Sequence, residues 1–443
     1  DGLTDEVTTD LSKLRALRVI SRTSAMTFKG TTKDAHTIAR ELGVRYILEG
    51  GVRRGGDRLR ITARLIDAER DKHVWVDKYE GPIADVFGIQ ERIAREIAGA
   101  LKLQLTADED RGLATRPIEN VHAYECYLLA RQEAWRWRKD AIAHAIQLLE
   151  NGLALVGPNA RLYAAVGHAH LQYREAGLDF SARPLDEAEA CVRKVLALEP
   201  ESASTMQLRG WIHYGRGEIQ SAVHDLKAAL EIEPNNADVL LLLTNCYLIS
   251  GYVAAARPLI DRVLAVDPLT PVGRCMPAFA DAMEGNCSAA IEPYRQMFDM
   301  DPGNPMARLF YVWVLALNGR TDAIRSIAST VPSEVRDTIP ARLACFLAHA
   351  AAGDAASARA ALTPEIEEVA TGADVFPRIL AQGYAMARVP DKALDWLSIA
   401  VDRGFINYPF LAHYDPFFAP LRRLPRFEEI LRGVRRRWET FTP

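Results

Sequence analysis

The apolar runs between residues 121 and 400 end in prolines that return at a fixed interval. These prolines are Pro200, Pro234, Pro268 and Pro302, each 34 residues after the one before, and their lead-ins are alike: LALEP, LEIEP, LAVDP and FDMDP. Proline cannot continue a helix, so each one is expected to follow the end of a helix. A fixed period of this length predicts a stack of two-helix units.

Small residues also recur within each unit. In the unit that starts at Ala203, Gly210, Ala222 and Ala229 occupy positions 8, 20 and 27, where two antiparallel helices must approach closely. Leu226 is expected to fill the space between units. The next unit repeats the pattern with Tyr247, Gly251, Ala256 and Pro268, and the one after it with Gly285, Ala290 and Pro302. These residues and their spacing resemble the tetratricopeptide repeat.

The resemblance covers residues 121–400 and implies about seven helical hairpins. Two further units are expected upstream, at residues 124–158 and 163–200, the second lengthened by an insertion at EAGLDFSARP. Downstream the pattern weakens in the unit from Pro305, where Ile324 stands in place of the expected alanine, and it breaks at Pro332. Because the ends of a solenoid must be covered, the segment 414–443 is expected to form a closing helix. The predicted solenoid therefore spans residues 121–413.

The first hundred residues differ from the rest: short segments are expected to form strands, and two of them alternate with a period of two. RVISRTS, VRYILEGGVRR, RLRITARLID and HVWVDKY are the expected strands, and the middle two are joined by a turn at Gly55-Gly56-Asp57, a strong hairpin signal. On the strand that follows this turn the side chains alternate. One face carries Leu59, Ile61, Ala63 and Leu65, and the other carries Arg58, Arg60 and Arg64.

Two helices complete this region, at residues 33–42 and after Asp85. Asp85 is expected to cap a helix with an apolar stripe formed by Val86, Ile89, Ile93, Ile97 and Leu101. A polar, proline-containing segment follows at residues 106–120. The sequence thus predicts an α+β domain at residues 1–105, a linker at 106–120 and an all-α solenoid afterwards.

The N-terminal region resembles the TolB amino-terminal-like (FlgO-like) domain of bacterial signalling proteins. The resemblance rests on DGLTDEV, RVISRTS, FKG, ARELGVRYILEGGVRR and DVFGIQERIA. In that family a strand precedes the helix that opens here at Asp1, and this sequence lacks it. The α+β domain is therefore expected to be incomplete and the chain to be a fragment or a processed product. The resemblance also implies an effector joined upstream: a serine/threonine kinase, an adenylate or guanylate cyclase, or a winged-helix regulator.

Composition and charge narrow the classes of partner. A net charge of −4 gives no reason to expect nucleic acid. The most apolar stretch, residues 239–249, is too short to span a bilayer. The six cysteines form no C-x-x-C pair and are expected to be small buried thiols. We expect a cytoplasmic location, or a periplasmic one if a transmembrane helix precedes the chain.

The sequence contains no motif of a known catalytic site. A phosphate loop, a G-x-S-x-G elbow, an S-x-x-K pair and an H-E-x-x-H motif are all absent. His168 and His170 diverge by about 200° on one helix and cannot share a metal. Arg58, Arg60 and Arg64 are interpreted as a solvated sheet face rather than a phosphate site. No enzymatic activity, metal or cofactor is expected.

The inner groove of the repeats is the candidate site. In tetratricopeptide repeats, positions 2, 5, 9, 12 and 13 of each first helix line the concave face. His122, Glu125 and His168 are expected there in the early units. The main candidates for binding a peptide or protein segment are Gln207, Trp211, Tyr214, Asp238, Asn245, Phe279, Met283 and Trp313. Tryptophan and tyrosine dominate binding hot spots, although packing between units would also explain Trp211 and Trp313. Leu241 stands where a carboxylate-clamping lysine would be.

Three functional hypotheses follow. The favoured one is a non-catalytic interaction and regulatory module that binds a peptide or protein in the groove. The second is a small-ligand sensor in which the α+β domain binds and the repeats transmit. The third, and least favoured, is a hydrolase with an unrecognised site.

Overall fold

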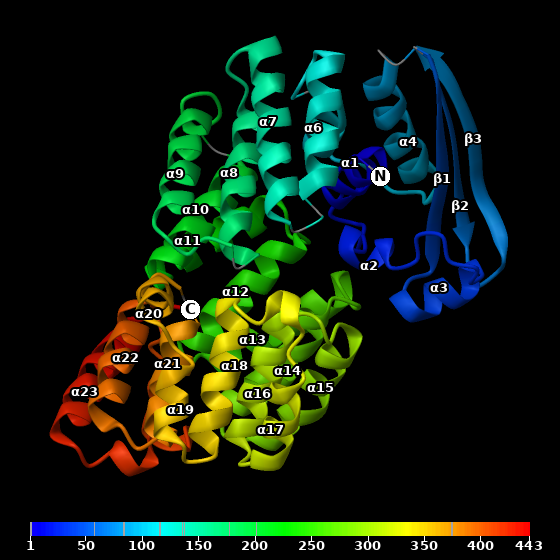
Figure 1. The fold of residues 1–443 in the computed structure, drawn as a ribbon. Coiled ribbons are helices and arrows are strands. Elements are labelled where there is room, and N and C mark those ends of the chain that lie inside the picture. The colour runs from blue at the N-terminus through cyan, green and yellow to red at the C-terminus, as the bar shows by residue number, and fades with distance from the viewer. Residues whose placement is uncertain are drawn as a thin grey trace.

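The computed structural model describes residues 2–56, 58–82, 85–114, 117–134, 136, 138–176, 178–200, 202–373 and 375–443. A three-stranded sheet lies near the N-terminus and helices follow it to the other end of the chain (Figure 1). Within the described residues, strands occur only before residue 83. The fold is therefore an α+β domain followed by an all-α tetratricopeptide repeat solenoid, as the sequence predicts.

The sheet is antiparallel in the order β1-β2-β3. Its strands are β1 (Tyr46–Gly55), β2 (Arg58–Asp67) and β3 (Lys72–Pro82). Gly55 lies opposite Arg58 in the register, and Gly56 between them has a φ of +59°. This register confirms the predicted hairpin. Its turn needs a positive φ, which glycine adopts easily. Asp57, the third residue of that turn, lies outside the described residues.

The core of the α+β domain forms on one face of β2. Leu59, Ile61, Ala63 and Leu65 are buried, whereas Arg58, Arg60 and Arg64 on the other face are exposed. The helix α4 (Val86–Ala100) covers this face, and α1 (Gly2–Ser12) packs against α4, while α3 (Ala35–Leu42) contacts β1. The apolar stripe of α4 is confirmed for Ile89, Ile93 and Ile97, each at most 2% exposed. Asp85 precedes α4 without a side-chain capping hydrogen bond.

The predicted strand RVISRTS is not formed. Residues 18–21 are irregular, and the short helix α2 (Arg22–Met26) follows, capped by the side chain of Ser21. The backbone N–H of Ser21 donates to the carbonyl of Val266, 2.6 Å away, and the hydroxyl of Ser24 donates to Asp267 at 2.6 Å. The strand prediction was wrong because this segment finds its backbone partner in the repeats instead of in the sheet.

Residues 106–120 contain more structure than a polar linker implies. They include the helix α5 (Ala107–Ala114), and Leu113 and Ile118 are 4% and 1% exposed. Asp110 pairs with Arg95 of α4, and the carbonyl of Pro117 accepts a hydrogen bond from Asn159 at 2.6 Å. The segment between the two parts therefore packs against both of them.

The solenoid is a series of helical hairpins followed by a closing helix, and within the described residues it has one hairpin more than the sequence pattern predicts. A further helix, α20 (Pro364–Thr371), lies between the last two hairpins, and the closing helix is α23 (Pro425–Thr440). The hairpins pair α6 (Val121–Ala134) with α7 (Lys139–Val156), α8 (Ala160–Glu175) with α9 (Arg183–Leu196), α10 (Ala203–Arg216) with α11 (Ile219–Ile232), α12 (Ala237–Ile249) with α13 (Val253–Val266), α14 (Pro271–Met283) with α15 (Ile291–Met300), α16 (Pro305–Leu317) with α17 (Thr321–Ser329), α18 (Ile339–Ala351) with α19 (Ala355–Ala360), and α21 (Phe376–Met386) with α22 (Pro390–Asp402).

The periodic prolines and small residues have the roles expected of them. Pro234, Pro268 and Pro302 each follow the end of the second helix of a hairpin by two residues. Gly210 is buried where α10 meets α11, and a Cβ atom built there would lie 2.7 Å from Cδ2 of Leu226. The 34-residue period thus arises from close helix contacts.

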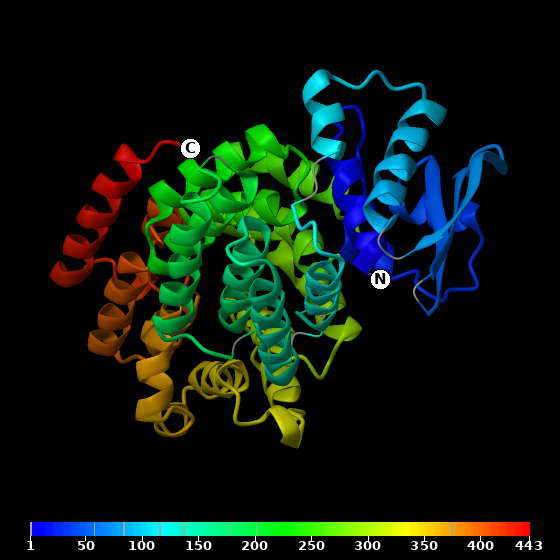
Figure 2. The ribbon, with the colours of Figure 1, turned by 90° about the horizontal axis from the view of Figure 1, so that it is seen from above.

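The C-terminal part of the chain folds back onto the turns of earlier hairpins (Figure 2). The segment 402–414 contacts three successive turn glycines. A Cβ built on Gly217 would lie 2.7 Å from Cα of Arg403, one on Gly251 2.8 Å from Oδ1 of Asn407, and one on Gly285 2.7 Å from Cδ1 of Tyr414. We call this segment the strap. Its Ile406 N–H also donates to the carbonyl of Ile249, at 3.2 Å.

A second contact joins the early and late hairpins. The insertion after α8 carries Phe180, which is 7% exposed and packs edge-on against Phe376 of α21 with ring centroids 5.0 Å apart. Arg174 of α8 donates to the carbonyl of Gly372 at 2.6 Å. The solenoid is therefore closed on itself rather than open at its C-terminal end.

Candidate interaction surface

The first helices of the hairpins line the inner face of the solenoid. Neighbouring first helices contact one another: α6 with α8, α8 with α10, α10 with α12, and α12 with α14. Elements that approach one another across successive repeats lie on the inside of the curve. The candidate residues sit on four of these helices, with Gln207, Trp211 and Tyr214 on α10, Asp238 and Asn245 on α12, Phe279 and Met283 on α14, and Trp313 on α16.

Two neighbouring helices bring an aromatic and amide cluster together on this face. Trp211 and Tyr214 meet edge to face with ring centroids 6.3 Å apart, and Asn245 donates to the hydroxyl of Tyr214 at 2.8 Å. All three are half-buried. Gln207 is half-buried beside them, and Asp238 is exposed. This part of the candidate site offers apolar ring surface and hydrogen-bonding groups.

Phe279, Met283 and Trp313 do not face an open groove. They are 6%, 1% and 1% exposed. The guanidinium of Arg378, from α21, lies 4.9 Å from the Trp313 ring and 5.7 Å from the Phe279 ring. The prediction of an accessible groove was wrong for these three residues. The C-terminal hairpins cover this half of the inner face, and the repeat pattern gives no sign of that contact.

A buried hydrogen-bond chain fixes this covered half. The indole N–H of Trp313 donates to Oε1 of Gln382 at 2.8 Å, and Nε2 of Gln382 donates to Oδ2 of Asp415 at 2.7 Å. Burial raises the pKa of Asp415 to about 6, despite hydrogen bonds from Gln382 and from the backbone of Phe417 that lower it. Trp313 is thus a structural side chain in this protein.

The structure reveals an arginine pocket at the start of the solenoid that the sequence analysis missed. Tyr127 and Arg131 of α6 and Arg161 of α8 form it. The Tyr127 hydroxyl accepts hydrogen bonds from Arg131 at 3.0 Å and from Arg161 at 2.9 Å. Glu6 of α1 occupies the pocket and accepts from these side chains at 3.2 to 3.4 Å.

The electrostatics of the arginine pocket favour a carboxylate. Burial raises the pKa of Glu6, but Arg161 and Arg131 more than compensate, so the pKa stays below its usual value. Burial and the same two arginines lower the pKa of His168 to about 4, so that this imidazole is neutral near pH 7. Two arginines and a neutral histidine therefore lie near Glu6, and Lys13 and Asp10 of the same segment also act on this carboxyl group.

The position of the first repeat explains why sequence reasoning missed this pocket. His122 and Glu125 were expected on the inner face, but the side chain of His122 is 78% exposed at the start of α6. Ala130 is 1% exposed on α6, which packs against α7, so it occupies the small-residue position 8 of the first unit. With this register, Tyr127 and Arg131 fall at positions 5 and 9, which line the inner face. In the second unit Gly167 is closely packed against Leu208 and occupies the small-residue position 8. Arg161 then falls at position 2, which lines the inner face, and this spacing was the available signal.

The remaining polar clusters are ordinary surface or core groups. Arg60 and Arg64 of the sheet pair with Glu80 at 3.2 Å and Glu49 at 2.9 Å, as in a solvated face. In the part of the chain that the structure describes, no group of three His, Cys, Asp or Glu side chains is arranged to hold a metal ion. No disulfide joins the six cysteines, which all lie in the described part of the chain and are buried or half-buried.

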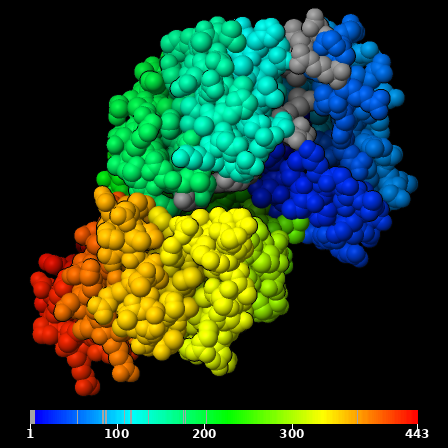
Figure 3. Space-filling model, viewed as in Figure 1, coloured from blue at the N-terminus to red at the C-terminus, as the bar shows by residue number. Residues whose placement is uncertain are grey.

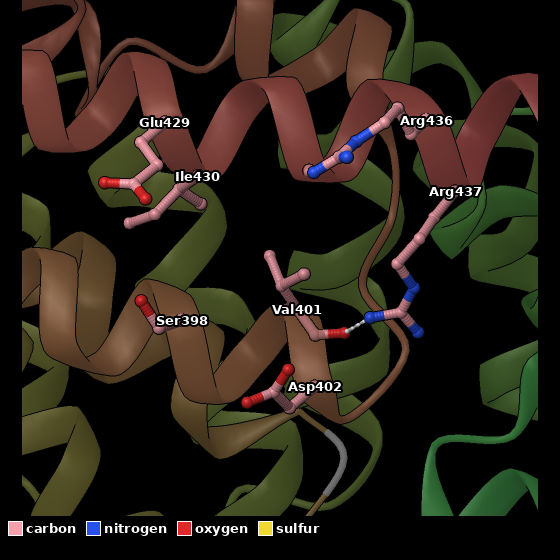
Figure 4. Close-up of a pocket in the computed structure, with 8 residues that line it drawn as sticks. Ser398, Val401, Asp402, Glu429, Ile430, Arg436 and Arg437 are labelled. Carbon is pink, nitrogen blue, oxygen red and sulfur yellow. Dashed lines mark hydrogen bonds between the residues drawn. The ribbon is translucent and has the colours of Figure 1, made fainter.

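A surface pocket of about 380 Å³ lies between α22 and α23 (Figure 4). Glu429 and Arg436 line it from α23 and Asp402 from α22, while Arg437 of α23 donates to the carbonyl of Val401 at 2.6 Å. This last bond ties the closing helix to the final hairpin. Among the described residues, we find no helix with the length and apolar character needed to cross a membrane.

The helical part is thus a solenoid of two-helix repeats, the architecture of the tetratricopeptide repeat. Residues 213–272 match the family model of the tetratricopeptide repeat. Two solved structures of tetratricopeptide repeat proteins are similar. One, from Thermus thermophilus, is 18% identical with a TM-score of 0.35 and covers 44% of this chain and 98% of its own. The other, from Parabacteroides merdae, is 15% identical with a TM-score of 0.38 and covers 55% and 97%.

A curated relative is similar over part of the chain. The chain is 36% identical over 166 residues to putative adenylate cyclase 3 of Rhizobium meliloti (strain 1021). The aligned part is 38% of this chain and 28% of that protein. The chain thus spans less than a third of the length of the relative it matches.

Proposed function

We propose that this chain is a regulatory part of a bacterial signalling protein and that it binds an extended segment of a partner protein on the inner face of its repeats. The repeat fold supports the interaction role. The similarity to a putative adenylate cyclase supports the signalling setting. The binding surface is centred on Trp211, Tyr214 and Asn245.

One observation carries the choice of this surface. Trp211 and Trp313 occupy the same position in units three apart, but only Trp211 retains accessible surface beside Tyr214 and Asn245. Aromatic side chains that retain accessible surface and have polar neighbours are typical anchors of protein interfaces. An extended segment would stack on Trp211 and hydrogen-bond the amide of Asn245.

We also propose the domain organisation that goes with this role. Residues 1–105 form a TolB amino-terminal-like domain, residues 106–120 connect it to the solenoid at 121–413, and residues 414–443 cap the solenoid. A kinase, cyclase or winged-helix effector would be joined upstream, and the cytoplasm is the proposed compartment. The similarity to putative adenylate cyclase 3 supports the cyclase setting.

The proposed function is tested with peptides selected from a random display library against the whole chain. Trp211→Ala removes the central ring of the surface. A buried aromatic anchor contributes about 2 kcal/mol or more on truncation, so the selected peptides should bind about thirtyfold more weakly. Fluorescence polarisation of labelled peptides measures this affinity, and circular dichroism checks folding.

Arg58→Ala is the control. Arg58 is exposed on the sheet, away from the repeats, and its loss should leave peptide affinity unchanged. A result in which Arg58→Ala abolishes binding while Trp211→Ala has no effect would reject the proposed surface and favour the α+β domain as the binding element.

A further inference from the structure

We propose that the arginine pocket binds an acidic side chain of the partner segment and that Glu6 of α1 competes with that partner for it. The inference rests on the proposed function, because it names the chemical class of the segment that binds the inner face. It also makes α1 a built-in competitor, so that the N-terminal domain lowers the affinity of the repeats for acidic partners.

The pocket is built by the repeats alone. Tyr127 is 2% exposed, and its hydroxyl holds both guanidinium groups at 2.9 and 3.0 Å. Arg131 and Arg161 also lie over the Tyr127 ring, 5.8 and 5.4 Å from its centroid. These contacts do not involve α1. The two arginines therefore keep their positions when the carboxylate changes.

The hydrogen bonds that Glu6 accepts are longer than those between Tyr127 and the two arginines. Its Oε1 atom accepts from Tyr127 at 3.2 Å, from Arg131 at 3.3 Å and from Arg161 at 3.4 Å. Charge-assisted hydrogen bonds to a carboxylate are usually about 2.7–2.9 Å long. A partner carboxylate that reaches deeper into the pocket would form the shorter contacts that Glu6 does not.

The two arginines of the pocket are largely buried, and their positive charges therefore favour an anionic partner there. The side chains of Arg131 and Arg161 are 28% and 26% exposed, and that of Glu6 is 13% exposed. Removing one partner from a largely buried charge pair is costly, because the remaining charge is left without compensation. The negative charge of Glu233 also acts on Arg161, and Arg161 in turn acts on Asp10 of α1. The site therefore selects an acidic group.

The arginine pocket is continuous with the proposed binding surface. Arg161 lies on α8, which packs against α10, and the ring of Trp211 packs against the apolar cluster that includes Ala160 and Ala164 of α8. A segment that stacks on Trp211 and continues toward α6 reaches the pocket. One acidic residue beside an aromatic or apolar stretch would satisfy both places.

For exchange to occur, the Glu6 side chain must leave the pocket while α1 stays packed against α4 and α6. The apolar face of α1 packs inside the α+β domain through Val7 and Leu11, so its acidic edge is what meets the repeats. Separate contacts hold the domain in place, including the hydrogen bond from Gln90 to Tyr124, 2.6 Å long. In the space-filling view the dark-blue N-terminal residues lie between the rest of their domain and the repeats (Figure 3).

The test uses the full chain and two fluorescein-labelled probes, an amidated deca-glutamate and an amidated deca-glutamine. Glu6→Gln removes the competing charge and should tighten deca-glutamate binding about tenfold at about 0.15 M salt, the size of a typical coupling between sites. Adding Arg161→Met should abolish this gain. Deca-glutamine should bind the parent and Glu6→Gln chains equally weakly.

Arg325→Met in the Glu6→Gln chain is the matched control. Arg325 is a 68% exposed arginine on α17, and its loss should leave the tightened binding intact. If Glu6→Gln does not fold, Glu6→Asp, whose shorter side chain still carries a charge, should give a smaller gain in the same direction.

Two outcomes overturn the inference. Either Glu6→Gln binds deca-glutamate no better than the parent, which makes the contact a fixed domain interface, or Arg161→Met leaves the gain in place. If library-selected peptides still bind in a manner that depends on Trp211, the proposed function stands and only the acidic class of partner is rejected.

Discussion

At the scale of single residues, a small residue stabilises the repeat only where a neighbouring helix packs closely against it. Gly210 faces Cδ2 and Cγ of Leu226 at 2.7 and 2.8 Å from the position of a Cβ atom, and Leu226 is fully buried and cannot move away. Gly433, within the closing helix α23, has no neighbouring atom within 4 Å of the same position. Both glycines are in helices. The contact with Leu226 leaves no room for a side chain at residue 210, whereas residue 433 has room for one.

The same substitution should therefore have opposite effects at these two positions. Gly210→Ala overpacks the contact between α10 and α11 and should lower the free energy of unfolding by about 1–3 kcal/mol. Gly433→Ala removes helix-destabilising flexibility and should raise it by about 0.5–1 kcal/mol. Urea unfolding followed by circular dichroism measures both. Equal effects at the two sites would show that the assigned repeat register is incorrect.

At the scale of elements, α21 determines which half of the inner face is open. It supplies Arg378 to the Trp313 ring and Gln382 to the chain that ends at Asp415. Asp415 is fully buried, and burial raises its pKa to about 6. The carboxyl is thus most compatible with the packed C-terminal hairpins when it is protonated.

The stability contributed by Asp415 should fall as the pH rises. Its pKa in the folded chain, about 6, lies above the ordinary value of 3.8, so the folded state holds the proton more tightly between these values. The folded state loses stability across that window, by about 3 kcal/mol in total, and the loss is complete above pH ~6. Asp415→Asn does not titrate, so the stability difference between parent and variant should change with pH in this window.

Unfolding free energies of both chains, measured from about pH 4 to pH 7.5, check this. Other titrating groups affect parent and variant alike and cancel in the difference. A difference that stays constant across the window would mean that the carboxyl titrates normally.

The elements were largely predictable from the sequence, but their long-range contacts were not. The 34-residue spacing of Pro234, Pro268 and Pro302 predicted the hairpins, because each proline acts on its own helix. The strand expected at RVISRTS, residues 18–24, does not form, because the backbone partner of Ser21 is Val266, far along the chain. Trp211 and Trp313 cannot be told apart from the sequence, since they share a repeat position and only the return of α21 buries one of them.

At the scale of the whole molecule, two contacts hold the early and late hairpins together. One is the strap at residues 402–414, and the other joins Phe180 in the insertion after α8 to Phe376 of α21. In an open solenoid each repeat contacts only its neighbours, and the ends can unfold independently. Here the second hairpin is packed against the last one.

Removing the ring of Phe180 should loosen this closure. Phe180→Ala deletes a side chain that is 7% exposed and should lower the free energy of unfolding by about 3 kcal/mol. Small-angle X-ray scattering should show a larger radius of gyration. Leu178→Ala in the same loop, 40% exposed, is the control and should change stability by less than about 0.5 kcal/mol. A loss of stability without expansion would place Phe180 in a local core rather than in the closure.

The strap also bears on how this protein can evolve. Open repeat arrays readily gain or lose units by duplication or deletion, because every junction is equivalent. In this chain Arg403, Asn407 and Tyr414 meet Gly217, Gly251 and Gly285 in order, so each turn is matched to one place on the strap. A duplicated unit between α10 and α22 would carry the strap away from its three turns. The number of hairpins in this stretch is therefore fixed by geometry, and changes in length are confined to loops and to hairpins outside it.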